Sequence, residues 1–287
     1  MKISEEDLKK ILPKDGPHVS EILKYVKKYK DEIITIKYGG NVFIDRIIFN
    51  NFISDLSILK NLGLSVVVVH GGGPRIKREL DKLNINSKFV RGLRVTDKKI
   101  INIVEDVLIE FNEDIVTSLN KLGVASISLN TKENNVIEIK PEAKELGYVG
   151  IPNRINSRFI KKIIKSGLMP IISPLGLDSD KKTYNINGDT AAGAIAKSLK
   201  CRRLLLMTNV EGVLDKNKNL ISEISSSSVI KMIEDDTITE GMIPKINTCL
   251  EAVNNGVKAA AIIDGRKKHS VLFEIFSDIG SGTLIRK

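Results

Sequence analysis

The sequence is poor in cysteine, histidine and tryptophan, with two, three and none among 287 residues. Cys201 and Cys249 lie far apart, without CxxC spacing and without a neighbouring histidine cluster, which argues against a disulfide framework and a zinc site. This cysteine usage indicates a reducing cytoplasm. Apolar runs are far shorter than the roughly 20 residues that span a bilayer, and the charged N-terminal segment lacks the apolar stretch of a signal peptide. We therefore expect a cytoplasmic protein with no membrane partner.

The net charge of +10 and an isoelectric point near 9.4 would permit nucleic-acid binding. The basic residues are scattered among 35 acidic ones, however, and aromatic residues make up only 5% of the chain. A surface for phosphate backbones and stacked bases needs clustered cations and aromatic side chains. We expect no nucleic-acid partner, and the charge favours small ligands that carry phosphate.

Apolar, β-branched runs alternate with amphipathic stretches along the chain. A strand-like run at 33–38 precedes a helix-like segment from Asp45 to Leu62, and a second run at 64–70 precedes a helix-like segment from Arg75 to Leu83. A turn-rich hairpin is expected between Asn130 and Pro152. Continuous Val, Ile and Leu runs are typical of a parallel sheet with helices on both faces. In such a sheet ligands bind at the carboxyl ends of the strands.

Two glycine-rich segments follow strand-like runs. Lys37 ends the first run and is followed by Gly39 and Gly40. Glycines let the backbone approach an anion and the lysine adds a positive charge, although a solvated lysine before an ordinary turn would look the same. The second run is followed by three glycines at 71–73 and by Pro74, which suits the start of a helix. A helix start of this kind indicates an anion site; the alternative, a flexible linker, fits poorly between a strand and a helix.

Three later segments add polar candidates. Arg94 lies in a turn before a helix, where it could hold a carboxylate through two parallel hydrogen bonds. Asn185, Asn187 and Asp189 alternate at the start of a helix of small residues, which allows close packing under a ligand, although a strand ending in a helix cap would look the same. Lys245 begins another helix. The Walker A and protein-kinase signatures are absent from the sequence, so phosphoryl transfer here would use another scaffold.

The order of these motifs resembles that of the N-acetylglutamate kinases of the amino acid kinase family. The likeness rests on KYGGN, VHGGGP, GLRVTD, YNINxDTAAGAIA, VEGVLD and GMIPK, and it extends from Lys37 to Ile285. It implies an αβα sandwich around a mostly parallel sheet of about eight strands. It further implies an oligomerisation helix at 1–31, a lobe at 32–190 that holds acetylglutamate, and a lobe at 191–287 that holds ATP and arginine.

The resemblance implies a role for each candidate residue. Lys37 and Lys245 match two lysines that act on the transition state, and Asp189 matches the aspartate that orients both. Gly40, Gly71 and Gly72 match glycines whose amides bind the transferring phosphoryl group and the acceptor. Arg94 and Asn185 match the residues that hold the α-carboxylate and the acetamido group of acetylglutamate, and Asn187, which lies beside them, is also implied to bind this substrate. The implied ATP contacts are Thr208, Asn209, Gly212 and Lys245.

The implied reaction moves the γ-phosphoryl group of ATP to the side-chain carboxylate of N-acetyl-L-glutamate, a step of arginine biosynthesis, with Mg²⁺ entering as MgATP. A γ-carboxylate with a pKa of about 4.3 is ionised at pH 7, so the reaction needs no general base and no catalytic histidine. Lysines, glycine amides and Mg²⁺ can relieve the repulsion between an anionic acceptor and ATP. We expect no metal ligand from the chain itself.

Two positions depart from the family pattern, which usually has alanine at Gly188 and aspartate at Asn209. Gly188 adds backbone freedom beside Asp189, and Asn209 removes a negative charge near the nucleotide. Two rival functions stay open: a kinase for acetyl-aminoadipate or aspartate, and a catalytically silent arginine sensor. The sequence does not reveal the pocket depth that separates glutamate from its longer homologue. The sensor would require the loss of a catalytic lysine or aspartate, and all three are present.

Both ends of the chain suggest regulation. Apolar side chains recur at helical spacing between Val19 and Lys30, with lysines on the opposite face, and such a stripe needs a surface to cover it. In arginine-sensitive family members this helix joins dimers into a ring, so the resemblance implies a homohexamer, a trimer of dimers, inhibited by L-arginine. The implied arginine contacts are Tyr25, His269, Glu274 and Gly280. The alternative is a helix packed on its own subunit beside a solvated Glu274.

Overall fold

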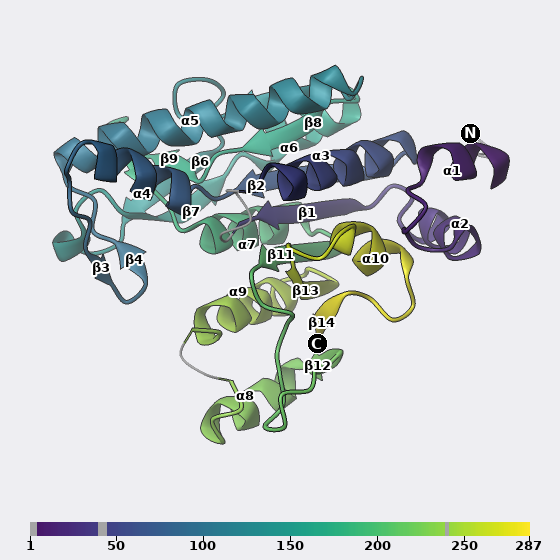
Figure 1. Cartoon of the computed structure of the whole chain (residues 1–287). Helices are drawn as coiled ribbons and strands as arrows, with labels where there is room; N and C mark the ends of the chain where they lie inside the picture. The colour runs from purple at the N-terminus through teal and green to yellow at the C-terminus, as the bar shows by residue number, and fades with distance from the viewer. Residues whose placement is uncertain (1–4, 40–44, 239–240) are drawn as a thin grey trace.

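The structure, a computed structural model, describes residues 5–39, 45–238 and 241–287 of the chain (Figure 1). An eight-stranded sheet runs through its centre. From edge to edge its strands are β12 (Glu223–Ser225), β14 (Gly282–Arg286), β13 (Ala259–Asp264), β11 (Arg203–Thr208), β1 (Ile33–Tyr38), β2 (Ser65–His70), β8 (Met169–Ile172) and β5 (Ser126–Leu129). The strands from β13 to β5 are parallel, and β14 is antiparallel to β13. The predicted mostly parallel sheet is confirmed.

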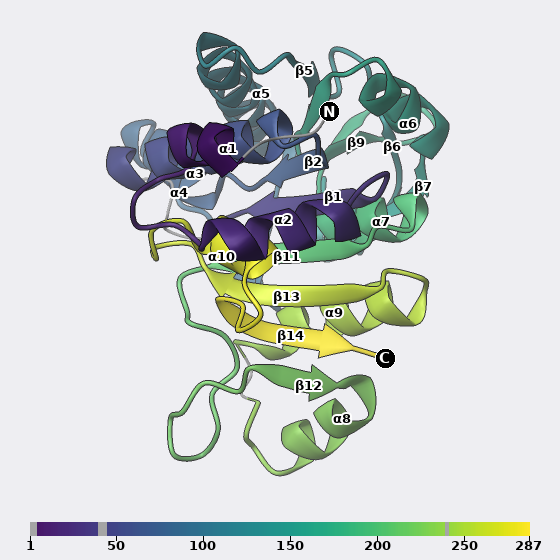
Figure 2. The same ribbon diagram turned by 90° about the vertical axis from the view of Figure 1, so that its right-hand side faces the viewer.

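Helices cover both faces of this sheet (Figure 2). One face carries α3 (Arg46–Asn61), α5 (Lys98–Lys121) and α10 (Ser270–Phe276), and the other carries α6 (Ser157–Lys165), α7 (Gly188–Leu199) and α9 (Ile243–Asn254), with α8 (Ser226–Glu234) at the β12 edge. Along β2, Val66 and Val68 join the core under α3, whereas Val67 and Val69 join the core under α7. Burial on both faces explains the continuous apolar runs. The predicted αβα sandwich is confirmed.

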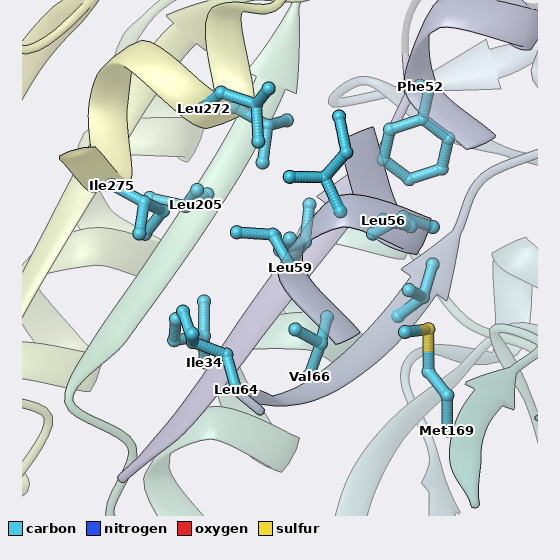
Figure 3. Packing of buried hydrophobic residues seen from close by; sticks show 14 of the residues in the cluster. Ile34, Phe52, Leu56, Leu59, Leu64, Val66, Met169, Leu205, Leu272 and Ile275 are labelled. Atoms are coloured by element: carbon cyan, nitrogen blue, oxygen red, sulfur yellow. The ribbon is translucent and has the colours of Figure 1, made fainter. Parts of the chain in front are cut away.

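Figure 3 shows the core between α3, α10 and the sheet. Phe52, Leu56 and Leu59 lie on α3 at three- and four-residue spacing and pack with Ile34 of β1 and Val66 of β2. All five side chains are at most 2% exposed. Full burial of a side chain of this size contributes about 1.5–3 kcal/mol, so this packing holds β1 and β2 firmly against α3.

Two smaller sheets lie beyond the carboxyl ends of β1 and β2. A four-stranded sheet has the order β10 (Thr183–Asn185), β9 (Leu175–Leu177), β6 (Ile137–Pro141) and β7 (Gly150–Ile155). Its antiparallel β6–β7 pair, joined through a 3₁₀ turn at Lys144–Leu146, is the hairpin predicted between Asn130 and Pro152. A two-stranded ribbon, β3 (Phe89–Val90) and β4 (Leu93–Arg94), carries Arg94.

Two helices precede the first strand: α1 (Glu5–Ile11) and α2 (Val19–Lys28). The helix predicted from Val19 onward is confirmed, and its side chains Ile22 and Tyr25, with Tyr29 just after it, are at most 7% exposed. Because α2 packs against α10 of the same chain, this chain itself covers part of the apolar stripe. Within the described residues, the helices are too short or too polar to cross a membrane.

Candidate active site

The carboxyl ends of the parallel strands meet along one edge of the main sheet. Register pairs Lys37 of β1 with Val69 of β2 on one side and with Leu206 of β11 on the other. The segments that follow these strands therefore start side by side. One of them is the glycine turn at 71–73, from which α4 (Gly73–Lys82) begins. This edge is where open α/β sheets bind their ligands.

Three charged side chains converge at this edge. Lys37 lies near the end of β1, Asp189 in the first turn of α7, and Lys245 in the first turn of α9. Lys37 Nζ is 2.8 Å from Asp189 Oδ1, and Lys245 Nζ is 2.6 Å from Asp189 Oδ2. One carboxylate thus holds two ammonium groups, one on each oxygen. The structure brings together the three residues that the sequence nominated for catalysis.

Local structure keeps Asp189 in place and ionised. Asn187 caps α7, because its Oδ1 accepts hydrogen bonds from Asp189 N at 2.9 Å and Thr190 N at 3.1 Å. Burial by itself would raise the pKa of Asp189, but the charges of Lys37 and Lys245 outweigh burial and hold that pKa well below its usual range. The cluster of one anion and two cations has a net positive charge, which attracts anionic ligands.

Two glycines make room for Lys37. A Cβ on Gly39 would lie 1.8 Å from Lys37 Nζ, so any side chain there would displace the ammonium group. A Cβ on Gly188 would lie 3.3 Å from Lys37 Cε, so an alanine there would require the lysine to move by a few tenths of an ångström. The departure at Gly188 therefore relieves a tight contact with Lys37.

The glycine turn after β2 presents backbone N–H groups to the same space. The Gly71 N–H donates to Tyr38 O at 2.8 Å and joins the ends of β1 and β2. Gly72 is the cap of α4 and Gly73 its first residue, where N–H groups have no acceptor within the helix. The sequence assigned ligand-binding amides to Gly71 and Gly72. In the structure the Gly71 N–H already has a backbone acceptor, whereas Gly72 and Gly73 stand at the start of α4.

Arg94 faces the glycine turn from β4. Its guanidinium donates to Ser87 Oγ and, at 3.4 Å, to Gly73 O, and it lies 4.7 Å from the centre of the Phe89 ring. The residue is 8% exposed, and it forms no ion pair with a carboxylate of the described chain. The charge of Asp81 acts on Arg94 without a direct ion pair, and a buried cation with no such pair is costly, so a negatively charged ligand group would complete this part of the site.

These groups line a cavity of about 290 Å³, close to the lower limit for small-molecule sites. Its polar wall comprises Lys37, Asp189, Lys245, Arg94, Asn185, Asn187 and the glycines at 71–73, and its apolar wall includes Ile76, Leu108, Val149 and Ile186. A second cavity of about 660 Å³ shares Asp189 and Lys245 and extends along Thr190, Pro244 and Thr248. The charge cluster is therefore open from two sides, as a reaction between two ligands requires.

Of the four positions predicted to contact ATP, Lys245 lines both cavities, whereas the other three lie apart from them. Thr208, Asn209 and Gly212 belong to the end of β11 and the loop after it, and none of them lines either cavity. Gly212 has a φ of 149°, and a Cβ there would lie 2.5 Å from Thr283 Oγ1, so the shape of the loop requires glycine. Gly40, predicted to contact the phosphoryl group, lies outside the described residues.

Three of the residues predicted to bind arginine lie together beside α2, at the opposite end of β1 from the β3–β4 ribbon (Figure 1). Tyr25 Oη donates to Asp278 Oδ1 at 2.5 Å, and Glu274 Oε2 accepts from Ser281 N at 3.0 Å. Gly280 has a φ of 74°, and a Cβ there would lie 2.9 Å from Glu274 Oε2. Burial raises the pKa of Glu274. Glu274 is only 7% exposed, so the alternative that it is a solvated charge is wrong.

His269, the fourth predicted contact, has other partners. Its Nδ1 lies 2.6 Å from Asp55 Oδ1 of α3, and its Nε2 lies 3.5 Å from Asp15 Oδ1, between α1 and α2. The ring is buried at the amino end of α10. In this structure His269 therefore ties α10 to α3 and to the N-terminal segment.

Comparison with known proteins first defines the class. Residues 32–264 match the amino acid kinase family, and the chain belongs to this family of phosphotransferases. Within it, the chain is 55% identical over 285 residues to the acetylglutamate kinase of Pelagibacter ubique, covering 99% of each chain. It is 44% identical over 281 residues to the acetylglutamate kinase of Rhodospirillum centenum, covering 93% of this chain and 92% of the relative. The likeness to acetylglutamate kinases predicted from the motifs is confirmed, and the chain is an enzyme.

A solved structure supports the fold. The N-acetylglutamate synthase from Neisseria gonorrhoeae, complexed with coenzyme A and N-acetyl-glutamate, superposes with a TM-score of 0.85 at 21% identity. The match covers 93% of this chain and 62% of that chain, so this chain spans less than two thirds of the length of that protein. At this identity the similarity concerns the fold alone.

Sequence reasoning missed three groups at the site. Gly73 could have been recognised, because a proline in the first turn of α4 already indicates that Gly72 and Gly73 stand at the helix start. The space that Gly39 leaves for Lys37 appears only once the lysine folds back over the turn. Asn112, which contacts the end of β2 from α5, had no signal in the sequence.

Proposed function

We propose that the chain is an acetylglutamate kinase, which transfers the γ-phosphoryl group of ATP to the γ-carboxylate of N-acetyl-L-glutamate. The products are N-acetyl-L-glutamyl 5-phosphate and ADP, and the reaction belongs to arginine biosynthesis. The observation that carries the proposal is one carboxylate, Asp189, paired with Lys37 and Lys245 at the wall of a cavity that also contains Arg94. The high identity to acetylglutamate kinases supports the choice of substrate.

The geometry suits a reaction limited by charge repulsion. Arg94 offers a paired donor to the α-carboxylate of the acceptor, and Asn185 offers an amide to its acetamido group. The γ-carboxylate is already ionised, so the chain needs to supply positioning and positive charge without a base. Lys37 and Lys245, aimed by Asp189, stabilise the negative charge on the transferring group together with the amides of Gly72 and Gly73.

A kinase of this family uses ATP with a metal ion, and we propose Mg²⁺ for this chain. In its described part, the chain has no group of three or more His, Cys, Asp or Glu side chains that could hold a metal. Mg²⁺ commonly keeps several waters and binds through substrate phosphates, which suits a site whose carboxylate already pairs with two lysines. The ion supplies neutralisation of phosphate charge when MgATP is bound.

A coupled assay for ADP formation tests the proposal. The acceptors are acetylglutamate, glutamate, aspartate and acetyl-aminoadipate, each with MgATP, and we expect rapid turnover with acetylglutamate alone. Asp189→Asn provides the matched inactive control, because it keeps the shape and removes the charge between the lysines. Faster turnover with acetyl-aminoadipate or aspartate would favour the rival kinase. Turnover of none of the four would contradict the proposal and favour the silent sensor.

We further propose that L-arginine inhibits this enzyme and that it assembles as a homohexamer, a trimer of dimers, in the cytoplasm. Supporting observations are the buried Glu274 carboxylate, the space left beside it by Gly280, and Tyr25 on the neighbouring α2. A guanidinium could form two parallel hydrogen bonds with Glu274. This region and the charge cluster lie at opposite ends of β1, so inhibition would need two conformations with different affinities for arginine.

A further inference from the structure

His70 and Asn112 form a buried polar pair directly behind the glycine turn. His70 ends β2, Asn112 lies in α5, and both are 0% exposed. His70 Nδ1 lies 2.8 Å from Gly71 O, and Asn112 Nδ2 lies 3.1 Å from His70 Nε2. Neither side chain lines the cavity of about 290 Å³ that contains Lys37 and Arg94. Any effect of the pair on a ligand must therefore pass through the glycine turn.

These contacts select one tautomer of His70. Gly71 O can only accept a hydrogen bond, so Nδ1 carries the proton and Nε2 of the neutral ring is an acceptor. Asn112 Nδ2 donates to that Nε2 and also donates to Ile171 O at 3.1 Å, which fixes the orientation of the amide. Burial lowers the pKa of His70 to about 4, so the ring is neutral at pH 7.

The hydrogen bond to Gly71 O sets the direction of the next N–H group. The peptide group between Gly71 and Gly72 is planar and trans, so the Gly72 N–H points opposite to the Gly71 carbonyl. With the carbonyl directed at the buried imidazole, the N–H is directed away from it, toward the cavity that Gly72 lines. Accepting a hydrogen bond also polarises the peptide group and strengthens its N–H as a donor.

We infer that His70 and Asn112 are positioning residues for phosphoryl transfer: Asn112 holds the imidazole in its Nδ1–H form, and His70 aims the Gly72 N–H at the reacting groups. The inference rests on the proposed kinase function and deepens it. In this arrangement hydrogen bonds run from Asn112 of α5 to His70 of β2 and on to the glycine turn, and they hold the Gly72 N–H in position.

A purely structural role does not account for this arrangement. Asn112 Oδ1 is buried and has no hydrogen-bond partner among the described residues. An unsatisfied buried acceptor is destabilising, whereas an apolar side chain of similar size would carry no such penalty. What asparagine adds at this position is its two N–H groups, and one of them goes to His70.

Steady-state kinetics of four variants tests the inference. His70→Leu removes the donor to Gly71 O, whereas His70→Asn keeps one, because its Nδ2 takes a position similar to that of imidazole Nδ1. Asn112→Leu removes the donor to His70 Nε2, so the His70 ring is no longer held in its Nδ1–H tautomer. We expect kcat to fall about 10- to 100-fold in both leucine variants, with the KM for ATP changed by less than about threefold, and His70→Asn to recover most of the loss. The fourth variant, His70→Leu combined with Asn112→Leu, should be no slower than His70→Leu alone, because Asn112 acts through His70.

Asn130→Ala is the matched control. Asn130 is also a buried asparagine, 4% exposed, but its Oδ1 accepts from Lys132 N and Glu133 N in a turn away from the cavity. Its loss should lower Tm and leave kcat unchanged. If the two leucine variants behave like this control, with kcat preserved at temperatures well below their Tm, the pair is structural and the inference is wrong.

NMR of the wild-type enzyme labelled with ¹⁵N-histidine gives a test that does not depend on folding of a variant. The His70 ring should carry its proton on Nδ1 from pH 6 to pH 8; a proton on Nε2 would overturn the inference. Wild-type enzyme that forms no ADP with acetylglutamate, yet shows the Nδ1–H ring, would contradict the kinase function and leave the tautomer assignment standing. The two failures are thus distinguishable.

Discussion

At the scale of single residues, Lys37 and Lys245 share one carboxylate but differ in surroundings. The Lys37 side chain is 8% exposed and sits over Gly39, whereas that of Lys245 is 23% exposed and opens to both cavities. Removing Lys37 would leave a gap in the buried cluster. Removing Lys245 lets water replace the ammonium group, so this substitution reports on catalysis with less damage to the fold.

Lys245→Ala should lower kcat by about 10²–10³-fold and raise the KM for acetylglutamate much less, because the charge is proposed to act on the transition state. Rate measurements at saturating ATP check this. Lys197→Ala is the matched control, since Lys197 Nζ pairs with Glu251 Oε1 at 2.6 Å on another part of α7. An unchanged kcat in Lys245→Ala would remove the proposed role.

Arg94→Lys should weaken acetylglutamate binding by about 10-fold or more and leave the affinity for ATP nearly intact. A lysine keeps the charge but cannot form two parallel hydrogen bonds with a carboxylate or lie flat against Phe89. Isothermal titration with each ligand measures the two affinities separately. Equal losses for both ligands would argue against a role specific to the acceptor.

The stability of the enzyme should depend on the titration of His70. Its folded pKa of about 4 lies below the ordinary value of about 6.5, so the unfolded chain binds more protons between these values. The contribution of His70 to the free energy of unfolding is fully present above its ordinary pKa of about 6.5 and is lost as pH falls toward 4. From pH 7 to pH 5 the wild type should lose on the order of 2 kcal/mol more unfolding free energy than His70→Asn. Urea unfolding at both pH values measures the difference, and parallel behaviour of the two proteins would contradict it.

At the scale of secondary-structure elements, three helices begin at the same cavity. Gly73 of α4, Asp189 of α7 and Lys245 of α9 all lie in first turns and all line it. Each helix start carries a partial positive charge and unsatisfied N–H groups, so their convergence favours phosphate and carboxylate ligands. Separate segments of sequence thus contribute to one anion site.

The contact between α2 and α10 carries the prediction on inhibition. Glu274→Gln should raise the arginine concentration needed for half inhibition by about 10-fold or more, because an amide cannot accept both hydrogen bonds of a guanidinium. The uninhibited kcat should not change, since Glu274 is far from the charge cluster. Arginine titrations of the wild type, Glu274→Gln and the exposed control Glu234→Gln test this. A wild type insensitive to millimolar arginine would refute regulation altogether.

At the scale of the whole molecule, the main sheet connects two chemically different ends. The charge cluster lies at the carboxyl ends of the strands, and the region of Tyr25 and Glu274 lies at the other end of β1 beside the N-terminal helices (Figure 1). The β1 strand is packed in the core along its whole length. In the proposed inhibition, a shift of α2 and α10 would act on Lys37 through this packed strand.

Removal of residues 1–30 should convert the proposed hexamers into active dimers. The deletion removes α2 and the buried Tyr29, so Tm should fall, while the charge cluster and its cavity keep all their residues. Light scattering measures the mass and the coupled assay measures kcat. A truncated enzyme that stays hexameric would show that α2 does not join the dimers.

The sequence alone was sufficient for the αβα class and the α2 helix, and it nominated Lys37, Asp189, Lys245 and Arg94 as site residues. Local patterns carry this information: apolar runs buried on two faces read as strands, and glycine before proline reads as a helix start. The family resemblance then connected motifs that are far apart in the chain. These motifs meet at one edge of the main sheet because the strands that precede them are parallel and end there.

Tertiary structure decided which atoms of these motifs are available. Gly71 and Gly72 look alike in the sequence, but strand pairing uses the Gly71 N–H for Tyr38 O and directs its carbonyl to His70. Asn112 joined the site because α5 crosses behind β2, a contact between segments 42 residues apart that leaves no local pattern. Hydrogen-bond partners and burial depend on where distant segments pack, so a sequence determines them only through the complete fold.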